Sequence, residues 1–246
     1  MNLDKYWTTN CGYFDWVITP RDKIIYKKYL KYITSLSRNS KVLEVGPWSW
    51  SFLLFFKNTF HLSDKNISTT DISKSVFDWL SKNPITKNFN NNYWDTIELL
   101  KKSQVKYDLI IMKHVLEHMT KEYISELIPL LVDSLNVWWQ ILVEVPNIMN
   151  YPFGYYMYWG DFSHYTAFND KSLREVFLWH AKKIDIHMYN LFLYIIDYKN
   201  PLRFIITLLQ KILYAIYIYW WLLLLKLTGL PIKVFTASLL CVIKKK

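Results

Sequence analysis

The sequence has few glycines and few cysteines. Only five of its 246 residues are glycine, so few turns can use backbone conformations that other residues avoid. The two cysteines, Cys11 and Cys241, have no paired spacing, which excludes a disulfide framework or a zinc ribbon and favours a reducing compartment. The first ten residues, MNLDKYWTTN, lack the apolar core of a signal peptide, so we expect a cytoplasmic protein.

Aromatic residues and positive charge are abundant instead. Aromatics make up 18% of the chain, which suits contact with an interface, although an AT-rich genome would also enrich tyrosine and phenylalanine. The net charge of +10 favours an anionic partner. Because the lysines are scattered and their clearest run is Lys244, Lys245 and Lys246, we expect an anionic membrane surface and no nucleic acid.

Residues 41–51, KVLEVGPWSWS, indicate the first strand and first turn of a nucleotide-binding α/β unit. Val42, Leu43 and Val45 are typical of a buried parallel strand, and Gly46 allows a sharp turn that approaches a ligand closely. The apolar run that follows predicts a helix over 50–57 that packs on a sheet.

The rest of the chain alternates between predicted strands and helices. Further strands are expected over 66–73, 85–93, 107–112, 140–145, 184–188 and 234–243, the polar segment 85–93 being the weakest pattern. Helices are expected over 19–36, after Ser73, over 120–135 and after Asn169 or Asp170. A long aromatic loop is expected over 151–168. This alternation requires a parallel sheet with right-handed crossovers, which 246 residues can build as one α/β domain.

Four of these strand ends, VLEVGP, TTDIS, YDLIIMKHVLEH and ILVEVPN, resemble the motifs of class I S-adenosylmethionine-dependent methyltransferases, particularly the branch found in bacterial glycan-biosynthesis clusters. The resemblance covers residues 41–188 and the last strand. It implies a Rossmann-like fold with a mostly parallel seven-stranded sheet and helices on both faces. It also implies S-adenosyl-L-methionine as methyl donor and an oxygen or nitrogen of a glycan or lipid-linked saccharide as acceptor.

The resemblance assigns a cofactor site to the ends of the first four strands. Glu44 would hold the methionyl amino group, Asp71 would accept both ribose hydroxyls, and Asp95 would face the adenine or be a surface carboxylate. The remaining predicted cofactor-binding residues are Gly46, Pro47, Ile72, Lys113 and His114.

The first turn departs from the family pattern. Trp48 and Trp50 stand where the family has its second and third glycines, which let the backbone approach the cofactor. This departure keeps a second hypothesis open, in which the chain is a catalytically inactive, membrane-associated scaffold with the same fold.

Two residues of the aromatic loop are candidate catalytic groups. His164 resembles the family's loop histidine and would hang over the transferring methyl group, where an imidazole could remove the acceptor's proton. Asp161 could orient that imidazole or bind the acceptor. A single loop histidine can also be purely structural.

A zinc site is the third hypothesis. His114, Glu117 and His118 match the H-x-x-E-H pattern, in which two histidines one helical turn apart hold zinc beside a glutamate. The motif follows a buried strand directly instead of lying within an amphipathic helix, and no third ligand is evident downstream. We therefore predict no metal.

The segment 201–230, PLRFIITLLQKILYAIYIYWWLLLLKLTGL, is the most hydrophobic part of the chain. Its uncharged run 212–225 has 14 residues, roughly 21 Å at ~1.5 Å per residue, which is short of a ~30 Å hydrocarbon core. We expect it to lie in a membrane interface, with cations that can meet anionic lipid; a buried hairpin or a dimer interface is the alternative. These cations are Arg203, Lys211, Lys226 and Lys233.

The predicted organisation has three parts. Residues 1–40 form an N-terminal cap and helix, 41–190 with 232–246 form the methyltransferase-like domain, and 191–231 form a hydrophobic helical insertion before the last strand. We expect a peripheral or monotopic protein at the inner face of the membrane. The sequence leaves the oligomeric state open.

Overall fold

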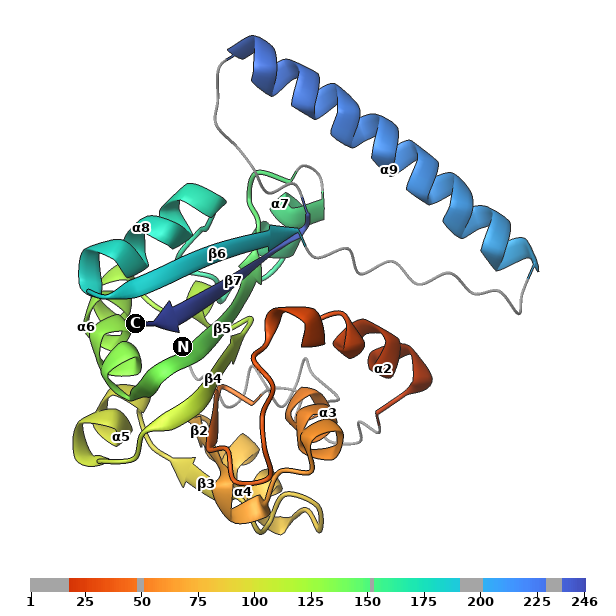
Figure 1. Cartoon of the computed structure of the whole chain (residues 1–246). Helices are drawn as coiled ribbons and strands as arrows, with labels where there is room; N and C mark the ends of the chain where they lie inside the picture. The colour runs from red at the N-terminus through yellow and green to blue at the C-terminus, as the bar shows by residue number, and fades with distance from the viewer. Residues whose placement is uncertain (1–17, 48–50, 151–152, 191–200, 229–235) are drawn as a thin grey trace.

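A computed structural model describes residues 18–47, 51–150, 153–190, 201–228 and 236–246 (Figure 1). Its centre is a seven-stranded sheet with the strand order β3-β2-β1-β4-β5-β7-β6. The strands are β1 (Val42–Val45), β2 (Ile67–Asp71), β3 (Asn90–Tyr93), β4 (Tyr107–Lys113), β5 (Leu135–Pro146), β6 (Ile184–Asn190) and β7 (Ser238–Lys245). The predicted mostly parallel, seven-stranded sheet is confirmed.

The parallel strands end at one edge of the sheet. β1 pairs in parallel with β2 and β4, β2 with β3, and β4 with β5. β7 is antiparallel to both β5 and β6, so β6 points the same way as β5. The carboxyl ends of β1 to β6 therefore share the edge at which sheets of this kind bind ligands.

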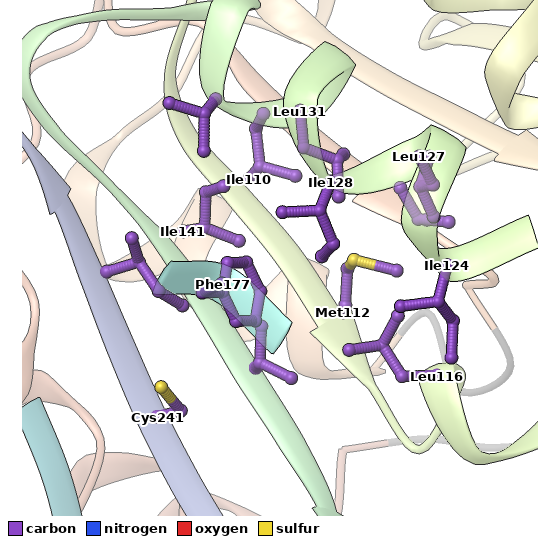
Figure 2. Close-up of a cluster of buried hydrophobic side chains, with 14 of the residues drawn as sticks. Ile110, Met112, Leu116, Ile124, Leu127, Ile128, Leu131, Ile141, Phe177 and Cys241 are labelled. Atoms are coloured by element: carbon purple, nitrogen blue, oxygen red, sulfur yellow. The ribbon is translucent and has the colours of Figure 1, made fainter. Parts of the chain in front are cut away.

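Helices cover both faces of the sheet (Figure 1). One layer contains α2 (Pro20–Lys27), α3 (Ser51–Phe60) and α4 (Lys74–Lys82), and the other contains α5 (Thr96–Lys102), α6 (Lys121–Asp133) and α8 (Asp170–His180). Alternate strand residues point into the two layers: Leu109 and Ile111 face α2 and α3, whereas Ile110 and Met112 face α6. Figure 2 shows the second layer, in which the apolar stripe of α6 packs on β4 and β5. The expected helices on both faces are confirmed.

Side-chain caps begin these helices where the sequence predicts them. Thr19 forms a capping box with Asp22 at α2, and Ser73 and Thr120 cap α4 and α6. Asn169 forms a second capping box at α8.

The first predicted helix is shorter than expected. α2 ends at Lys27 and a 3-10 turn, η2 (Leu30–Tyr32), follows, so the predicted span 19–36 is wrong in its second half. The Thr34 N–H donates to Oε1 of Gln140 at 3.1 Å. This contact with β5 replaces the helical carbonyl that a continuing helix would have supplied.

Two further boundaries differ from the sequence prediction. Leu135 begins β5 instead of closing α6, and β5 has 12 residues where 140–145 was expected. The residues 151–168, expected as a loop, contain the short helix α7 (Phe153–Trp159). The carbonyl of Asn150 accepts hydrogen bonds from Gly154 and Tyr155 at its start. The aromatic side chains of α7 show no helical period, so no sequence pattern predicts this helix.

The hydrophobic insertion contains one continuous helix, α9 (Pro201–Thr228), of 28 residues. Figure 1 shows it lying outside the sheet and its helical layers. Its contact with the domain includes Tyr214, whose hydroxyl accepts a hydrogen bond from Asn150 Nδ2 at 3.1 Å and whose ring lies 6.3 Å from that of Phe153. Among the described residues, no helix combines the length and apolarity needed to cross a membrane.

Candidate active site

Gly46 forms the turn at the end of β1. Its φ of +61° lies in the left-handed region, and its N–H donates to the carbonyl of Thr70 at 2.9 Å. A Cβ atom at this position would lie 2.8 Å from Cγ2 of Val115. Both facts require glycine here, as the sequence suggested, and the following Pro47 is buried. Trp48 and Trp50 lie outside the described residues.

Glu44 is a buried acid directly before this turn. Its side chain is 3% exposed, and its Oε2 has no hydrogen-bond partner among the described residues. Burial raises the pKa of Glu44 to about 8, although the charge of Lys113 opposes the shift. A buried polar atom without a partner is costly in free energy, so Glu44 is suited to receive a donor from a ligand.

Glu144 of β5 is a second buried acid, and its Oε2 has two close partners. Its Oε2 accepts a hydrogen bond from the Tyr29 hydroxyl at 2.6 Å and lies 3.4 Å from Nζ of Lys113. Burial opposes its ionisation, but Lys113, His114 and Tyr29 outweigh burial and hold the pKa of Glu144 well below its usual range. Glu144 is therefore a fixed negative charge beneath the site.

His114 bridges two buried acids immediately after β4. Its Nδ1 lies 3.1 Å from Oε1 of Glu117, and its Nε2 lies 3.4 Å from Oε1 of Glu144. Burial and Lys113 lower the pKa of His114, but the two glutamates outweigh them and the net shift is upward. Its φ of +54° is strained for a non-glycine residue, which is typical of residues that the surrounding structure holds at functional sites.

Asp71 is the last residue of β2, and Asp95 lies two residues after the end of the neighbouring strand β3. Oδ1 of Asp71 accepts the N–H of Ser73 at 2.7 Å, which fixes the carboxylate at the sheet edge, and the adjacent Ile72 is exposed. Asp95 caps α5 through Oδ1 and accepts the Tyr123 hydroxyl through Oδ2 at 2.7 Å. A structural role thus accounts for Asp95, while its part in adenine binding stays a prediction.

His164 lies beside His118 and Glu117. The two imidazole rings are 4.5 Å apart, and Nδ1 of His164 lies 2.7 Å from the carbonyl of Tyr158, to which it donates. Oδ1 of Asp161 accepts both the N–H of Ser163 at 2.8 Å and its hydroxyl at 2.6 Å. Asp161 thus orders the loop through Ser163, and its role towards the imidazole of His164 or the acceptor stays a prediction.

The structure therefore places most of the predicted residues along one edge of the sheet, and their roles stay predictions. Glu44, Lys113 and His114 form a polar cluster, and Glu117 connects it to His164. Asp71 and Asp95 lie along the same sheet edge, on the side of β2 and β3. Sequence reasoning missed Glu144 and Tyr29; the only signal was a charged residue inside the otherwise apolar motif ILVEVPN.

Comparisons with known proteins agree with this arrangement at the level of the fold. No protein-family model and no curated protein matches the sequence. A chain from the complex between the Haloferax volcanii Trm112 methyltransferase activator and a putative methyltransferase superposes with a TM-score of 0.64 at 11% identity, covering 97% of this chain and 96% of that one.

Two further solved structures have the same fold. A SAM-dependent methyltransferase from Archaeoglobus fulgidus gives a TM-score of 0.56 at 17% identity, covering 91% of this chain and 94% of that one. The N-methyltransferase NodS from Bradyrhizobium japonicum WM9, in complex with S-adenosyl-L-homocysteine, gives 0.54 at 13% identity, covering 76% and 89%. The fold is therefore that of class I SAM-dependent methyltransferases.

Proposed function

We propose that this protein transfers a methyl group from S-adenosyl-L-methionine to an oxygen or nitrogen of a glycan or lipid-linked saccharide at a membrane surface. The observation that carries the proposal is the buried Oε2 of Glu44 next to the glycine turn at Gly46, since this atom has no hydrogen-bond partner in the part of the chain that the structure describes. The ammonium group of the cofactor's methionine would satisfy that oxygen, and the turn lets the chain approach the cofactor closely.

The cofactor would supply the activated methyl group. The chain's own residues would bind the cofactor, orient the acceptor and accept its proton. Glu44 would hold the methionyl end and Asp71 the ribose. His164 donates from Nδ1 to the carbonyl of Tyr158, so its Nε2 carries the lone pair. That nitrogen is suited to accept the proton of an acceptor hydroxyl or amine when the acceptor is aligned with the methyl group.

The surface beside His164 supports the proposal that the acceptor is a saccharide. Exposed aromatic rings extend along α7 and the segment that follows it, and such exposed apolar clusters are typical of ligand-binding surfaces. Flat rings can pack against the apolar faces of sugar rings while their polar atoms stay in water. These residues are Phe153, Tyr155, Tyr156, Trp159, Phe162 and Tyr165.

The outer face of α9 supports the proposal that the protein acts at a membrane surface. Its exposed apolar side chains include neighbouring pairs and form one broad stripe along the helix, whereas Lys211 and Tyr214 are half-buried. The stripe consists of Ile205, Leu208, Leu209, Ile212, Leu213, Ile216, Tyr219, Trp220, Leu223 and Leu227. The alternatives of a buried hairpin or a dimer interface would cover this stripe with protein.

Neighbouring lysines favour an anionic lipid. Partial burial, then the nearby charges of Lys211 and Lys31, lower the pKa of Lys28. These three lysines, at the end of α2, in η2 and in α9, together create a region of positive potential, and anionic headgroups would reduce the repulsion between them. α9 also follows β6, whose carboxyl end shares the ligand edge, so a lipid-linked acceptor would arrive beside the site.

We expect S-adenosyl-L-homocysteine to bind in a calorimetric titration, which tests the proposed function directly. Asp71→Ala should weaken binding by about 1.5–3 kcal/mol, because a charge-assisted pair of hydrogen bonds to the ribose is lost. Asp78→Ala, which removes an exposed acid of α4 that pairs with Lys74, is the matched control and should leave affinity unchanged. Absence of heat and of a thermal shift at millimolar cofactor would reject the enzyme in favour of the inactive scaffold.

Cofactor affinity is expected to rise with pH. The pKa of Glu44 is about 8, so the free protein carries this acid protonated at pH 7, and an ammonium ligand must displace the proton. Affinity should therefore increase by up to about tenfold per pH unit below pH 8 and then level off.

Glu44→Gln separates this effect from other titrations. The amide resembles the protonated acid, so the variant should stay folded and bind the cofactor more weakly. The rise of cofactor affinity with pH that depends on Glu44 should be absent in this variant. Because the folded-state pKa is raised, the protonated acid favours folding at low pH, and the wild type should lose stability relative to Glu44→Gln as pH rises towards 8. If cofactor affinity depends on pH identically in the wild type and in Glu44→Gln, Glu44 does not hold the ammonium group of the cofactor.

The protein is expected to float with anionic liposomes through the stripe of α9. The double variant Ile212→Gln/Ile216→Gln should lower partitioning by about tenfold or more, since two half-exposed apolar side chains no longer enter the lipid. Leu178→Gln/Trp179→Gln removes comparable exposed side chains from α8 and should float like the wild type. If all three proteins stay in the soluble fraction, the membrane surface is not a partner.

A further inference from the structure

Three potential metal ligands converge beside the acceptor side of the site. Glu117, His118 and His164 each offer one ligand atom, and these atoms all lie within 4.8 Å of one another. Glu117 and His118 belong to the 3-10 turn η4 (Leu116–His118), and His164 comes from a segment 46 residues later. Backbone hydrogen bonds join the two segments: the carbonyl of Glu117 accepts from Tyr165 at 2.7 Å and from Thr166 at 3.1 Å. The convergence is thus built by the backbone and does not depend on chance side-chain contacts.

The carboxylate of this group has one oxygen without a hydrogen-bond partner. Glu117 is 1% exposed, its Oε1 lies 3.1 Å from Nδ1 of His114, and its Oε2 has no partner among the described residues. A buried acceptor left in this way is unfavourable unless something else satisfies it. A cation bound between Glu117 and the two imidazoles would do so.

The histidines also have the outer contacts that metal ligands need. A ligating imidazole usually donates its other ring N–H to a carbonyl or carboxylate, which fixes the ring and its tautomer. Nδ1 of His164 lies 2.7 Å from the carbonyl of Tyr158. Nδ1 of His118 lies 3.3 Å from the carbonyl of Ser163 and 2.9 Å from its hydroxyl oxygen. Asp161 in turn accepts the N–H and hydroxyl of Ser163, so the support of His118 is itself fixed.

We propose that Glu117, His118 and His164 form a site for a divalent transition-metal ion, with Zn²⁺ as the best match. Two imidazole nitrogens and one carboxylate are ligands that zinc takes in open sites, where the fourth position is left to water or substrate. Mg²⁺ and Ca²⁺ prefer oxygen ligands throughout and fit this donor set poorly.

This ligand set differs from the H-x-x-E-H pattern of the sequence. His114, the first histidine of that pattern, has its ring nitrogens directed at Glu117 and Glu144. Its place is taken by His164, which the spacing along the chain could not suggest. The inference replaces our prediction that the protein binds no metal.

The metal site does not rest on the proposed methyl transfer, although it would affect it. A hydroxyl or water at the open position would have a lowered pKa, so a metal could prepare an oxygen acceptor. The Nε2 atom of His164 would then be a ligand and not the base.

The test is metal binding by the full chain in the absence of cofactor. Protein freed of metal by a chelator is titrated with ZnCl₂ by calorimetry, and with CoCl₂ by the visible d–d absorption of the bound ion. One ion per chain is expected. His118→Ala and His164→Ala should each weaken binding by more than about 100-fold, and Ser163→Ala, which removes an outer contact, by about 10- to 100-fold.

His187→Ala provides the matched control, because this histidine is exposed on β6 outside the cluster. It should bind zinc like the wild type, and circular dichroism should show that all variants are folded. Lack of stoichiometric binding, equal binding by the His118 and His164 variants and the wild type, or binding of MgCl₂ alone would each overturn the proposal. Cofactor titration is a separate measurement, so failure of the proposed methyl transfer would not be mistaken for failure of the metal site.

Discussion

Replacing Glu144 with glutamine is expected to lower the free energy of unfolding by about 3–5 kcal/mol, because partners of a buried charge lose their counterion. Glu144 is 0% exposed and contacts the Tyr29 hydroxyl at 2.6 Å, Lys113 at 3.4 Å and His114 at 3.4 Å. Glutamine has the same shape, so the loss reports the charge and not a cavity. Urea denaturation followed by tryptophan fluorescence measures it.

Two controls separate the buried cluster from surface electrostatics. Glu126→Gln removes an acid that pairs with Lys101 while both side chains are more than half exposed, and it should cost less than about 1 kcal/mol. Tyr29→Phe removes only one hydrogen bond to the charged acid and should cost about 1.5–3 kcal/mol. A loss below about 1 kcal/mol for Glu144→Gln would show that Lys113 and His114 are satisfied without it.

The same carboxylate should make stability depend on pH on the acid side. The folded-state pKa of Glu144 is depressed, so its contribution is present above its unfolded pKa of 4.5 and is lost as pH falls further. As pH falls below about 5, the free energy of unfolding should therefore decrease more in the wild type than in Glu144→Gln.

The sheet could be predicted from the sequence because its strands are short apolar runs with clear ends. Each of the buried strands β1, β4 and β5 carries β-branched or aliphatic residues that suit a sheet covered on both faces. Gly46 could also be predicted, since a sharp turn after a buried strand needs a residue that tolerates positive φ. Local chemistry fixes both features.

The polar contacts of the site could not be predicted, since they join distant parts of the chain. Tyr29 meets Glu144 across 115 residues, and His118 meets Ser163 across 45. Neither pair has a spacing that a periodic pattern reveals. The short helix α7 was missed because its aromatic side chains show no period. Gly154 within it packs so closely on the carbonyl of Asn147 that a Cβ atom would lie 2.0 Å away, and this tertiary constraint also has no sequence signal.

Replacing His164 with alanine is expected to have the largest effect on activity. If its Nε2 accepts the acceptor's proton, kcat should fall by about 100- to 10,000-fold while cofactor affinity stays nearly unchanged. The contacts of His164 explain why the two effects separate: His164 contacts Tyr158 and His118, whereas Glu44 and Asp71 lie at the ends of β1 and β2. The acceptor must first be identified, by a mass increase of one methylene in glycans or lipids of cells that express the protein.

His187→Ala, on the exposed side of β6, should keep full activity. Loss of cofactor binding by His164→Ala, or loss of fold, would instead identify a structural histidine. The metal content distinguishes the two catalytic roles of His164. An imidazole base gives a rate that survives chelation, whereas a metal ligand gives a rate that chelator abolishes and ZnCl₂ restores. Both roles require His164 to lie beside η4. Hydrogen bonds from Tyr165 and Thr166 to the carbonyl of Glu117 hold it there. Lengthening the segment around Thr166 should therefore lower kcat even when His164 itself is kept.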